Sequence, residues 1–549
     1  KIINGDAPRF YIYVNENKDI SFVDGLNKDF YGLEDFELKL NGDIPQGFYS
    51  YNGKITNTDG IDSENYEFFF SFVDQSNYRI WVDDNYDSFT PGWGIDHFNN
   101  IKDGINQCIE GGLLYVQPGT YEEVFEIDKP IIIKSKWGAF STTITDENVK
   151  YSDLLDTSGQ TVKINSSHVL LEDFTIQRFE MLFAENTVGN IGSDPVSYVD
   201  VRDCTIESFF DTMIFRDVSY LSIYDNTFTC QNDDIAIYLE NIDNFMMVDD
   251  DLESYNYHAA YVKNSDKGFI DNLAINTKRI RGLFFDNCNN IYVTSTVFYN
   301  CEQEAFFVNN SENISIDNSI FTNNNLGICL GNDSIVKIKD NSYSNNSFDI
   351  YHAVYLNNYN THYSNIQKAI DLAEPKMDVN IYPGNYTENI VVNKSLDVHG
   401  LEDIEEVIIY GNSNTPAFLI APDSEVNDFF IEDLTISGGN HSLKTGIYQD
   451  VSGLIVSDCI IRNPQKGYAV YIDPHNFSDE SSARPGTDIF EDAVDFSYCK
   501  ITGGFYYQYW PYEVYTATID NQLVLRYNEI DNMFLNVSVS VLIKYNIIG

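Results

Sequence analysis

Between residues 196 and 332 the chain repeats with a period of about 23 residues, and each line of the repeat ends in Asn. Stacking the lines gives columns of like residues: Val262, Phe285, Val308 and Leu330 in one, and Asn264, Asn287, Asn310 and Asn332 in another. This period is too short for a βαβ unit, whereas short apolar runs separated by Asn, Asp and Ser suit three strands and turns per coil. We therefore predict a solenoid of parallel strands. Asn fits its turns because it tolerates left-handed backbone angles and its amide can bond to the next coil.

A second, longer repeat shows that the solenoid starts twice. At a constant offset and without a gap, "HFNNIKDGINQC" matches "HYSNIQKAIDLA" and "VQPGTYEEV" matches "IYPGNYTEN", and nine of 33 positions from His97 to Lys129 are identical. The apolar spacing within "IKDGINQCI" and "IQKAIDLA" predicts a short amphipathic helix in each copy. A solenoid end exposes its core and unpaired strand edges, so each helix is expected to act as a lid over the first coils.

The chain divides into three predicted parts. Residues 1–80 lack the coil period and alternate in short runs such as "YEFFFSFV", which favours a small β-sandwich-like module. Residues 81–350 and 351–549 are expected to be two β-helices, each opened by its lid. A length of 549 residues is well above the size of one compact core, which agrees with several domains.

In "YVQPGTYEE", in "WVDDNYDSFTPGWGIDHF" and in its coils, the chain resembles right-handed parallel β-helix proteins of the pectate-lyase type. It is similar in particular to the repeat-rich cell-surface, adhesin-like and S-layer-associated proteins of archaea and some bacteria. The resemblance covers roughly residues 81 to 549. It implies the fold and a surface location, but no single function, because this fold carries polysaccharide lyases, hydrolases, phage tailspikes and inert stalks alike.

Charge and composition narrow the possible partners. The chain carries 84 acidic and 33 basic residues, a net charge of -51, which repels nucleic acid and anionic lipid and attracts cations. No run of about 18 apolar residues is present, and the sequence starts at Lys1, so we expect a processed extracellular chain without a membrane span. Ten N-x-S/T sequons are glycosylation candidates: Asn165, Asn309, Asn313, Asn332, Asn345, Asn385, Asn393, Asn440, Asn476 and Asn536.

Cysteine and acidic motifs point to structure more than to metal chemistry. Cys204, Cys459 and Cys499 recur in one slot of the coil, where other copies carry Asn or Leu, so they are predicted to be buried single thiols. Neither CxxC nor CxxCH occurs, so the sequence gives no support for a zinc ribbon or a c-type haem site. The run "DDD" at residues 249–251 is expected to send neighbouring side chains to opposite faces of a strand.

One edge of the first β-helix gathers residues that are able to do chemistry. Aligned coils bring together the candidates Asp211, Asp233, Asp234, His258, Arg279, Arg281, Glu302 and Glu304. Coils about 4.8 Å apart would hold carboxylates near the separations that glycosidases use. The blocks "CQNDDIAIY", "YNYHAAY" and "KRIRGLFF" loosely resemble polygalacturonase-type hydrolases, but His258 lacks flanking glycines and Arg281 replaces a Lys. A structural ladder of mixed charge is the other interpretation.

One short motif suggests a metal. "DDNYD" sets Asp83, Asn85 and Asp87 at alternate positions, as in the first half of a calcium loop, although the Gly and distal Glu of an EF-hand are absent. An acidic linker between domains is the alternative. Calcium is the expected ion because the acidic surface offers hard oxygen ligands and no Cys/His cluster occurs. No organic cofactor is expected.

From the sequence alone, the favoured function is an extracellular structural protein that assembles with itself into a surface layer, filament or adhesive stalk. The final lines "LVLRYNEI" and "VLIKYNII" keep the coil pattern up to Gly549, so a head-to-tail contact at that end is expected. The alternatives are a secreted polysaccharide hydrolase or lyase that uses the carboxylates of the first β-helix, and a non-catalytic adhesin that binds surface glycans.

Overall fold

The computed structural model describes most of the β-helical region and part of the N-terminal region. Described are 11–14, 20–22, 47–56, 62–72, 79–149, 160–178, 188–190, 196–209, 211–231, 234–255, 257–412, 415–420, 429–438, 447–449, 454–463, 469–472, 494–503, 505–509, 523–530, 533–537, 541–544 and 546–548. The chain forms two compact units. Unit 1 comprises residues 1–307, 311–325 and 340–346, and unit 2 comprises residues 308–310, 326–339 and 347–549.

The N-terminal part of unit 1 contains one four-stranded sheet in the order β2-β1-β4-β3. Its strands are β1 (Tyr11–Val14), β2 (Ile20–Phe22), β3 (Gly47–Thr56) and β4 (Asp62–Phe72). β1 pairs antiparallel with β2 and parallel with β4, while β3 and β4 form an antiparallel pair. The sequence prediction of a β-rich module before the coils is therefore confirmed at the level of strands.

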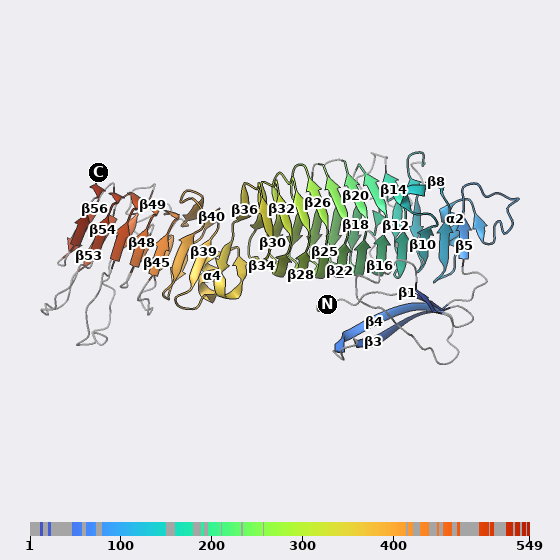
Figure 1. Cartoon of the computed structure of the whole chain (residues 1–549), viewed down its shortest axis with the longest axis horizontal. Helices are drawn as coiled ribbons and strands as arrows, with labels where there is room; N and C mark the ends of the chain where they lie inside the picture. The colour runs from blue at the N-terminus through green and yellow to red at the C-terminus, as the bar shows by residue number, and fades with distance from the viewer. Residues whose placement is uncertain are drawn as a thin grey trace. The chain divides into compact units, whose positions relative to one another are not determined.

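The rest of unit 1 is a right-handed parallel β-solenoid with three strands per coil. In one coil, β25 (Asp266–Asp271), β26 (Ala274–Thr277) and β27 (Leu283–Asp286) each pair in parallel with the strand one coil earlier. These strands belong to three sheets, which we name sheets I, II and III. Figure 1 shows the strands of this solenoid stacked as successive rungs. The coil period of the sequence is thus the period of the fold, as predicted.

The strands of the solenoid in unit 1 are as follows. Sheet I contains β5 (Arg79–Val82), β6 (His97–Phe98), β7 (Leu113–Val116), β10 (Ile132–Ser135), β13 (Val169–Glu172), β16 (Val196–Arg202), β19 (Val218–Tyr224), β22 (Asp243–Val248), β25, β28 (Asn289–Thr294) and β31 (Glu312–Asp317). Sheet II contains β8 (Gly119–Glu122), β11 (Thr142–Thr145), β14 (Thr175–Arg178), β17 (Thr205–Ser208), β20 (Thr227–Cys230), β23 (Asp251–Ser254), β26, β29 (Val297–Tyr299), β32 (Ile320–Thr322) and β35 (Ser342–Ser344). Sheet III contains β9 (Phe125–Ile127), β12 (Val162–Ile164), β15 (Val188–Gly189), β18 (Met213–Arg216), β21 (Ile237–Glu240), β24 (Ala260–Lys263), β27 and β30 (Glu304–Asn309).

Unit 2 contains a second parallel solenoid, which follows a short antiparallel junction. β37 (Val354–Leu356) pairs antiparallel with both β38 (Thr361–Tyr363) and β39 (Asp378–Ile381). Parallel pairing resumes from β39 to β42 (Asp397–Gly400) and continues through β45 (Phe429–Glu432), β48 (Leu454–Ser457), β51 (Val494–Ser497), β54 (Leu523–Arg526) and β57 (Val541–Lys544). The reversal of strand direction interrupts the coil pattern, and the duplicated sequence restarts here.

Each solenoid has a lid helix, as predicted: α2 (Ile101–Gln107) in unit 1 and α4 (Ile366–Leu372) in unit 2. Both lids are held by a glutamate of the "PGxYxE" turn, 22 residues after the first residue of the helix. Glu123 accepts the backbone N–H groups of Ile101 and Lys102 at 2.7 and 3.0 Å, and Glu388 makes the same two contacts to α4 at 2.8 and 2.9 Å. The repeat therefore preserves a carboxylate that satisfies the free N–H groups of a helix start.

The core columns and turns follow the alignment of the sequence. Val262, Phe285 and Val308 are fully buried. Asn264, Asn287 and Asn310 have left-handed backbone angles, with φ of 51°, 55° and 47°, and the Asn287 amide donates to the Asn264 side-chain oxygen at 2.8 Å. In the last line the left-handed position moves one residue on, to Asp333. All eight cysteines are buried and unbridged, which confirms the predicted single thiols.

A buried carboxyl group lies inside the turn between sheets I and II. Asp250 is fully buried, whereas Asp251, the first residue of β23, is exposed. The Oδ1 atom of Asp250 accepts the backbone and side-chain N–H groups of Asn226 at 2.8 and 2.9 Å, and the Oδ2 atom of Asp250 has no hydrogen-bond partner. Burial, and less strongly the charges of Asp225 and Asp249, raise the pKa of Asp250 well above its usual value, although the hydrogen bonds from Asn226 act in the opposite direction.

The raised pKa of Asp250 makes the free energy of unfolding decrease as pH rises. A carboxyl whose pKa is higher in the folded state stabilises the fold below its unfolded pKa of about 3.9, and that stability is lost as pH rises, by about 1.4 kcal/mol per unit. Asp203, with a pKa raised to about 6 by burial and then by Glu172, acts in the same direction. His258, with a pKa lowered by burial to about 4, acts in the opposite direction, but only below the unfolded His pKa of about 6.5.

We therefore expect the contribution of Asp250 to lower the Tm of the wild-type chain as pH rises above about 4. Asp250→Asn keeps an acceptor for Asn226 and cannot ionise, so it should flatten this fall and be more stable than the wild type at pH 8. Asp251→Asn, on the exposed side of the same turn, is the control and should leave the slope unchanged. Thermal melts at four pH values measure all three chains, and an equal slope for Asp250→Asn would contradict the assignment.

Candidate functional site

The described candidate residues of the first β-helix lie along the start of the sheet III strands. Asp211 and Asp234 precede β18 and β21, and His258 and Arg281 precede β24 and β27, so successive coils contribute one residue each. Parallel register of these strands fixes the order of the four positions. Asp233 lies outside the described residues.

Asp211 is the most perturbed carboxyl group of this edge. Its Oδ1 accepts the backbone N–H of Ile235 at 2.7 Å. Burial and, less strongly, the charge of Asp234 raise the pKa of Asp211 to about 6, although the hydrogen bond from Ile235 and the charges of Arg216 and Arg178 act in the opposite direction. A raised pKa on one of two neighbouring carboxyl groups is the arrangement by which a fold separates a proton donor from a charged carboxylate.

His258 belongs to the packing rather than to the solvent-facing edge. It is 4% exposed, its Nδ1 has no hydrogen-bond partner, and its ring lies 5.5 Å from Phe284 and 5.9 Å from Tyr261. Burial, and then the charge of Arg281, lower the pKa of His258 to about 4. At neutral pH this histidine is uncharged, and its position suits a packing role.

Arg281 is held by neighbours on its own coil and on the next one. Its Nε lies 2.9 Å from Glu304 Oε2, and its guanidinium stacks over the rings of Phe284 and Phe307 at 5.0 and 4.1 Å. Arg279 and Glu302 are exposed. Part of the predicted edge is therefore a structural charge ladder, and the carboxylates Asp211 and Asp234 form its end nearer the first coils.

An aromatic column on the outer face of sheet III was not predicted. It consists of Tyr238, Tyr261, Phe284 and Phe307, one from each of four successive coils at a constant spacing. The Tyr261 and Phe284 rings stack at 4.5 Å and 4°. The Tyr238–Tyr261 and Phe284–Phe307 pairs are tilted, at 60° and 55°, so only the middle pair of rings packs face to face. The constant spacing was visible in the sequence, one position before the predicted core column.

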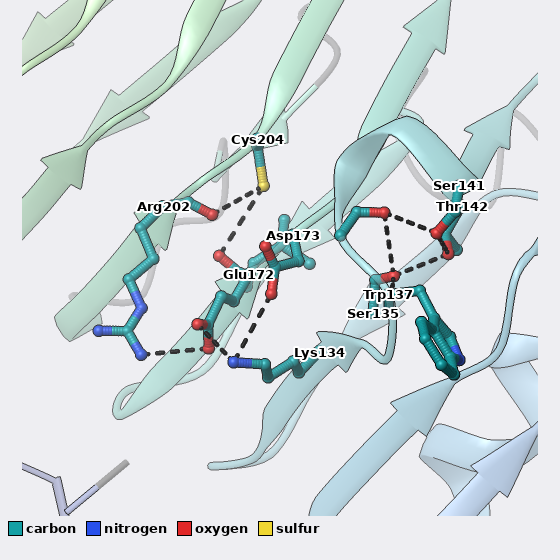
Figure 2. Close-up of polar contacts among 11 residues, drawn as sticks. Lys134, Ser135, Trp137, Ser141, Thr142, Glu172, Asp173, Arg202 and Cys204 are labelled. Carbon is teal, nitrogen blue, oxygen red and sulfur yellow. Dashed lines mark hydrogen bonds and ion pairs between the residues drawn. The ribbon is translucent and has the colours of Figure 1, made fainter. Parts of the chain in front are cut away.

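A second polar cluster lies on sheet I, near the first coils (Figure 2). Glu172 is only 2% exposed and binds two cations, Lys134 at 2.8 Å and Arg202 at 3.1 Å. Lys134 also lies 3.6 Å from Asp173. Register aligns Lys134, Glu172 and Arg202 in one outward column, which the sequence alignment missed because their separations exceed the coil period.

The described residues hold one cluster of potential metal ligands, which is not the predicted loop, and the structure leaves calcium a prediction. In the "DDNYD" loop, Asp83 Oδ1 accepts the Asn85 backbone and side-chain N–H groups, and Asp87 Oδ1 accepts the Phe89 N–H at 2.8 Å, so these oxygens shape local turns. Elsewhere, Asp378, Asp397 and His399 of unit 2 bring potential ligand atoms within 4.8 Å of one another. The sequence did not single out this second group.

The sequons differ in how far their amide groups are available. The Asn165, Asn313 and Asn345 amides donate to Glu126, Asn289 and Asn323 at 2.9, 3.0 and 3.2 Å. Asn393, by contrast, is exposed. Asn440 and Asn476 lie outside the described residues.

We expect N-glycosylation at Asn393 and none at Asn165, because Asn165 is partly buried and its amide is bonded within the solenoid. Glycopeptide mass spectrometry of material from a glycosylating host checks this. A glycan at Asn165 together with an unmodified Asn393 would contradict it.

These features define a right-handed parallel β-helix protein. Residues 189–348 match the family model described as the right handed beta helix region, which covers the coils that carry the candidate edge. No curated protein matches the chain. Among the described residues, no helix is long and apolar enough to cross a membrane.

Solved structures with similarity to the chain share little sequence with it. DFA-IIIase from Arthrobacter chlorophenolicus A6 is 12% identical, with 77% of this chain and 95% of that chain covered and a TM-score of 0.32. The A-module of the mannuronan C-5 epimerase AlgE4 of Azotobacter vinelandii is 10% identical over 44% of this chain and 88% of that chain, with a TM-score of 0.26. The pectin methylesterase of Aspergillus niger is 13% identical over 50% of this chain and 87% of that chain, with a TM-score of 0.24.

Proposed function

We propose that the chain is a glycan-cleaving enzyme of the hydrolase type, with Asp211 and Asp234 as its catalytic carboxyl groups. The observation that carries the proposal is the raised pKa of Asp211, to about 6, beside a second carboxylate one coil away. A carboxyl group that keeps its proton in mildly acidic solution is suited to protonate a leaving glycosidic oxygen.

In this proposal the two carboxyl groups take different roles. Asp211 donates its proton to the glycosidic oxygen as the bond to the anomeric carbon breaks, and Asp234 attacks that carbon to form a covalent ester. Water then hydrolyses the ester, and its proton returns to Asp211. Strands of adjacent coils lie about 4.8 Å apart, near the roughly 5 Å separation of retaining glycosidases, so we expect retention of configuration.

Charge favours an uncharged substrate. Arg281 is paired with Glu304, while Arg216 and Lys263 are paired with Glu240 at 3.3 and 2.9 Å, so these three cations already contact carboxylates. The net charge of -51 opposes the approach of uronic-acid polymers. A neutral polysaccharide therefore suits the site better than an acidic one.

The experiment is the release of reducing ends from a panel of neutral polysaccharides (mixed-linkage β-glucan, xylan and galactomannan) and from polygalacturonate at pH 5. We expect release from at least one neutral substrate and none from polygalacturonate. No release from any substrate would overturn the proposal. The self-assembling surface subunit favoured by the sequence stays a prediction, and light scattering of the purified chain tests it.

A further inference from the structure

The turn between β10 and β11 displays two large aromatic side chains to the solvent. Trp137 is 64% exposed and Phe140 is 91% exposed. In contrast to the column on sheet III, the described rings make no close stacking contact with either side chain. Large apolar groups exposed together on one surface commonly mark a binding site.

The base of this turn is firmly built. Ser135 and Thr142 are fully buried and their hydroxyl groups lie 2.7 Å apart. Ser141 donates to the carbonyl oxygen of Gly138 through its backbone N–H at 3.1 Å and through its hydroxyl at 2.9 Å. Figure 2 shows the indole of Trp137 pointing away from this hydrogen-bonded group. The exposed rings therefore stand on a preorganised support, which lowers the entropic cost of binding.

Gly138 is required at the centre of the turn. Its φ of 90° lies in the region that L side chains rarely adopt, and an added Cβ would lie 3.3 Å from the Phe140 ring. A Cβ atom at Gly138 would also lie 4.0 Å from Oδ1 of Asp173, so a carboxylate lies beside the turn. Thr175 fixes the far side by donating its hydroxyl to the Ala139 carbonyl oxygen at 2.9 Å.

We propose that Trp137 and Phe140 form a glycan-binding subsite, separate in sequence and sheet from the carboxylates of sheet III. The apolar face of a sugar ring stacks on the indole, and its hydroxyl groups donate to Asp173. The inference rests on the proposed function in one respect, that the ligand is a glycan, and does not require Asp211 to be catalytic.

Charge at this turn selects among ligands. Lys134 is paired with Glu172 and Asp173, so it is not a free cation for an anionic polymer. The net charge of the chain also opposes insertion of the two rings into an anionic lipid surface. An uncharged polysaccharide is left as the ligand that offers both an apolar face and hydroxyl donors.

The test is native affinity electrophoresis in gels that contain mixed-linkage β-glucan, xylan, galactomannan or polygalacturonate. Trp137→Ala and Phe140→Ala are compared with Phe89→Ala, a matched control because Phe89 is 90% exposed on another loop. We expect retardation of the wild type by a neutral polysaccharide, about tenfold weaker binding for Trp137→Ala, and a change of less than about twofold for Phe89→Ala. Trp137→Phe should keep part of the affinity.

Asp211→Asn separates this inference from the proposed function, since it should bind like the wild type while losing cleavage. Binding without any cleavage by the wild type would sink the catalytic proposal and support the subsite. Equal retardation of Trp137→Ala and the wild type, absence of retardation in every neutral gel, or a preference for polygalacturonate would overturn the subsite. The subsite proposal would also be overturned if Trp137→Ala abolished flotation with phosphatidylcholine vesicles and left the retardation by polysaccharides unchanged.

Discussion

Asp211→Asn is expected to lower the rate of glycan cleavage by about 10²- to 10⁴-fold, the usual contribution of a general acid. The amide keeps an acceptor for the Ile235 N–H, which lies 2.7 Å from Asp211 Oδ1, so the fold should remain intact. What is lost is the proton that burial and Asp234 hold on Asp211 at mildly acidic pH. The measurement is the initial rate on the neutral polysaccharide that the wild type cleaves.

The control for this variant is Glu302→Gln, which removes an exposed carboxylate from the same edge and should change the rate by less than about twofold. Asp234→Asn should be as damaging as Asp211→Asn. If Asp211→Asn cleaves as fast as Glu302→Gln, Asp211 is not the proton donor, and the edge is a charge ladder throughout.

Glu123→Ala is expected to destabilise the first solenoid by roughly 3 kcal/mol, because it leaves two backbone N–H groups of the lid without their charged acceptor. These are the N–H groups of Ile101 and Lys102, at 2.7 and 3.0 Å from the carboxylate. Glu388→Ala should have the same effect on the second solenoid. For a unit of this size the loss corresponds to a Tm that is lower by about 5 °C or more.

Calorimetry distinguishes the two lids if the units unfold in separate transitions, since each variant should move only one of them. Glu122→Gln is the matched control, because its carboxylate is exposed on the neighbouring residue and contacts the Asn148 amide. A Glu123→Ala chain that melts like Glu122→Gln would show that the lid does not depend on this carboxylate.

Most of the fold could be predicted from the coil period, because a parallel solenoid stacks each residue on its counterpart one period away. The columns of Val262, Phe285 and Val308 and of the turn Asn residues were correct for that reason. The duplicated lids were predicted from apolar spacing and an exposed solenoid end. The capping role of Glu123 was missed, since its partners belong to the preceding helix and the motif alone indicates only a turn.

The candidate site was predictable where the period is constant. By strand register, Asp211, His258 and Arg281 are at corresponding positions of their coils, while Asp234 lies one residue before the position that corresponds to Asp211. Their environments were not predictable, because the burial of His258 and the raised pKa of Asp211 depend on side chains from several coils at once.

The ion cluster of Figure 2 escaped the alignment for a related reason. Lys134 and Glu172 are 38 residues apart and Glu172 and Arg202 are 30 apart, since the first coils carry longer connections than the regular lines do. Sequence spacing therefore gave no fixed register between them.

The pH dependence of kcat/KM tests the central claim most directly, because it reports the protonation of the essential acid in the free enzyme. With Asp211 as the proton donor, kcat/KM of the wild type should fall as pH rises through an apparent pKa of about 6. A kcat/KM that stays constant from pH 5 to pH 8 would contradict the account.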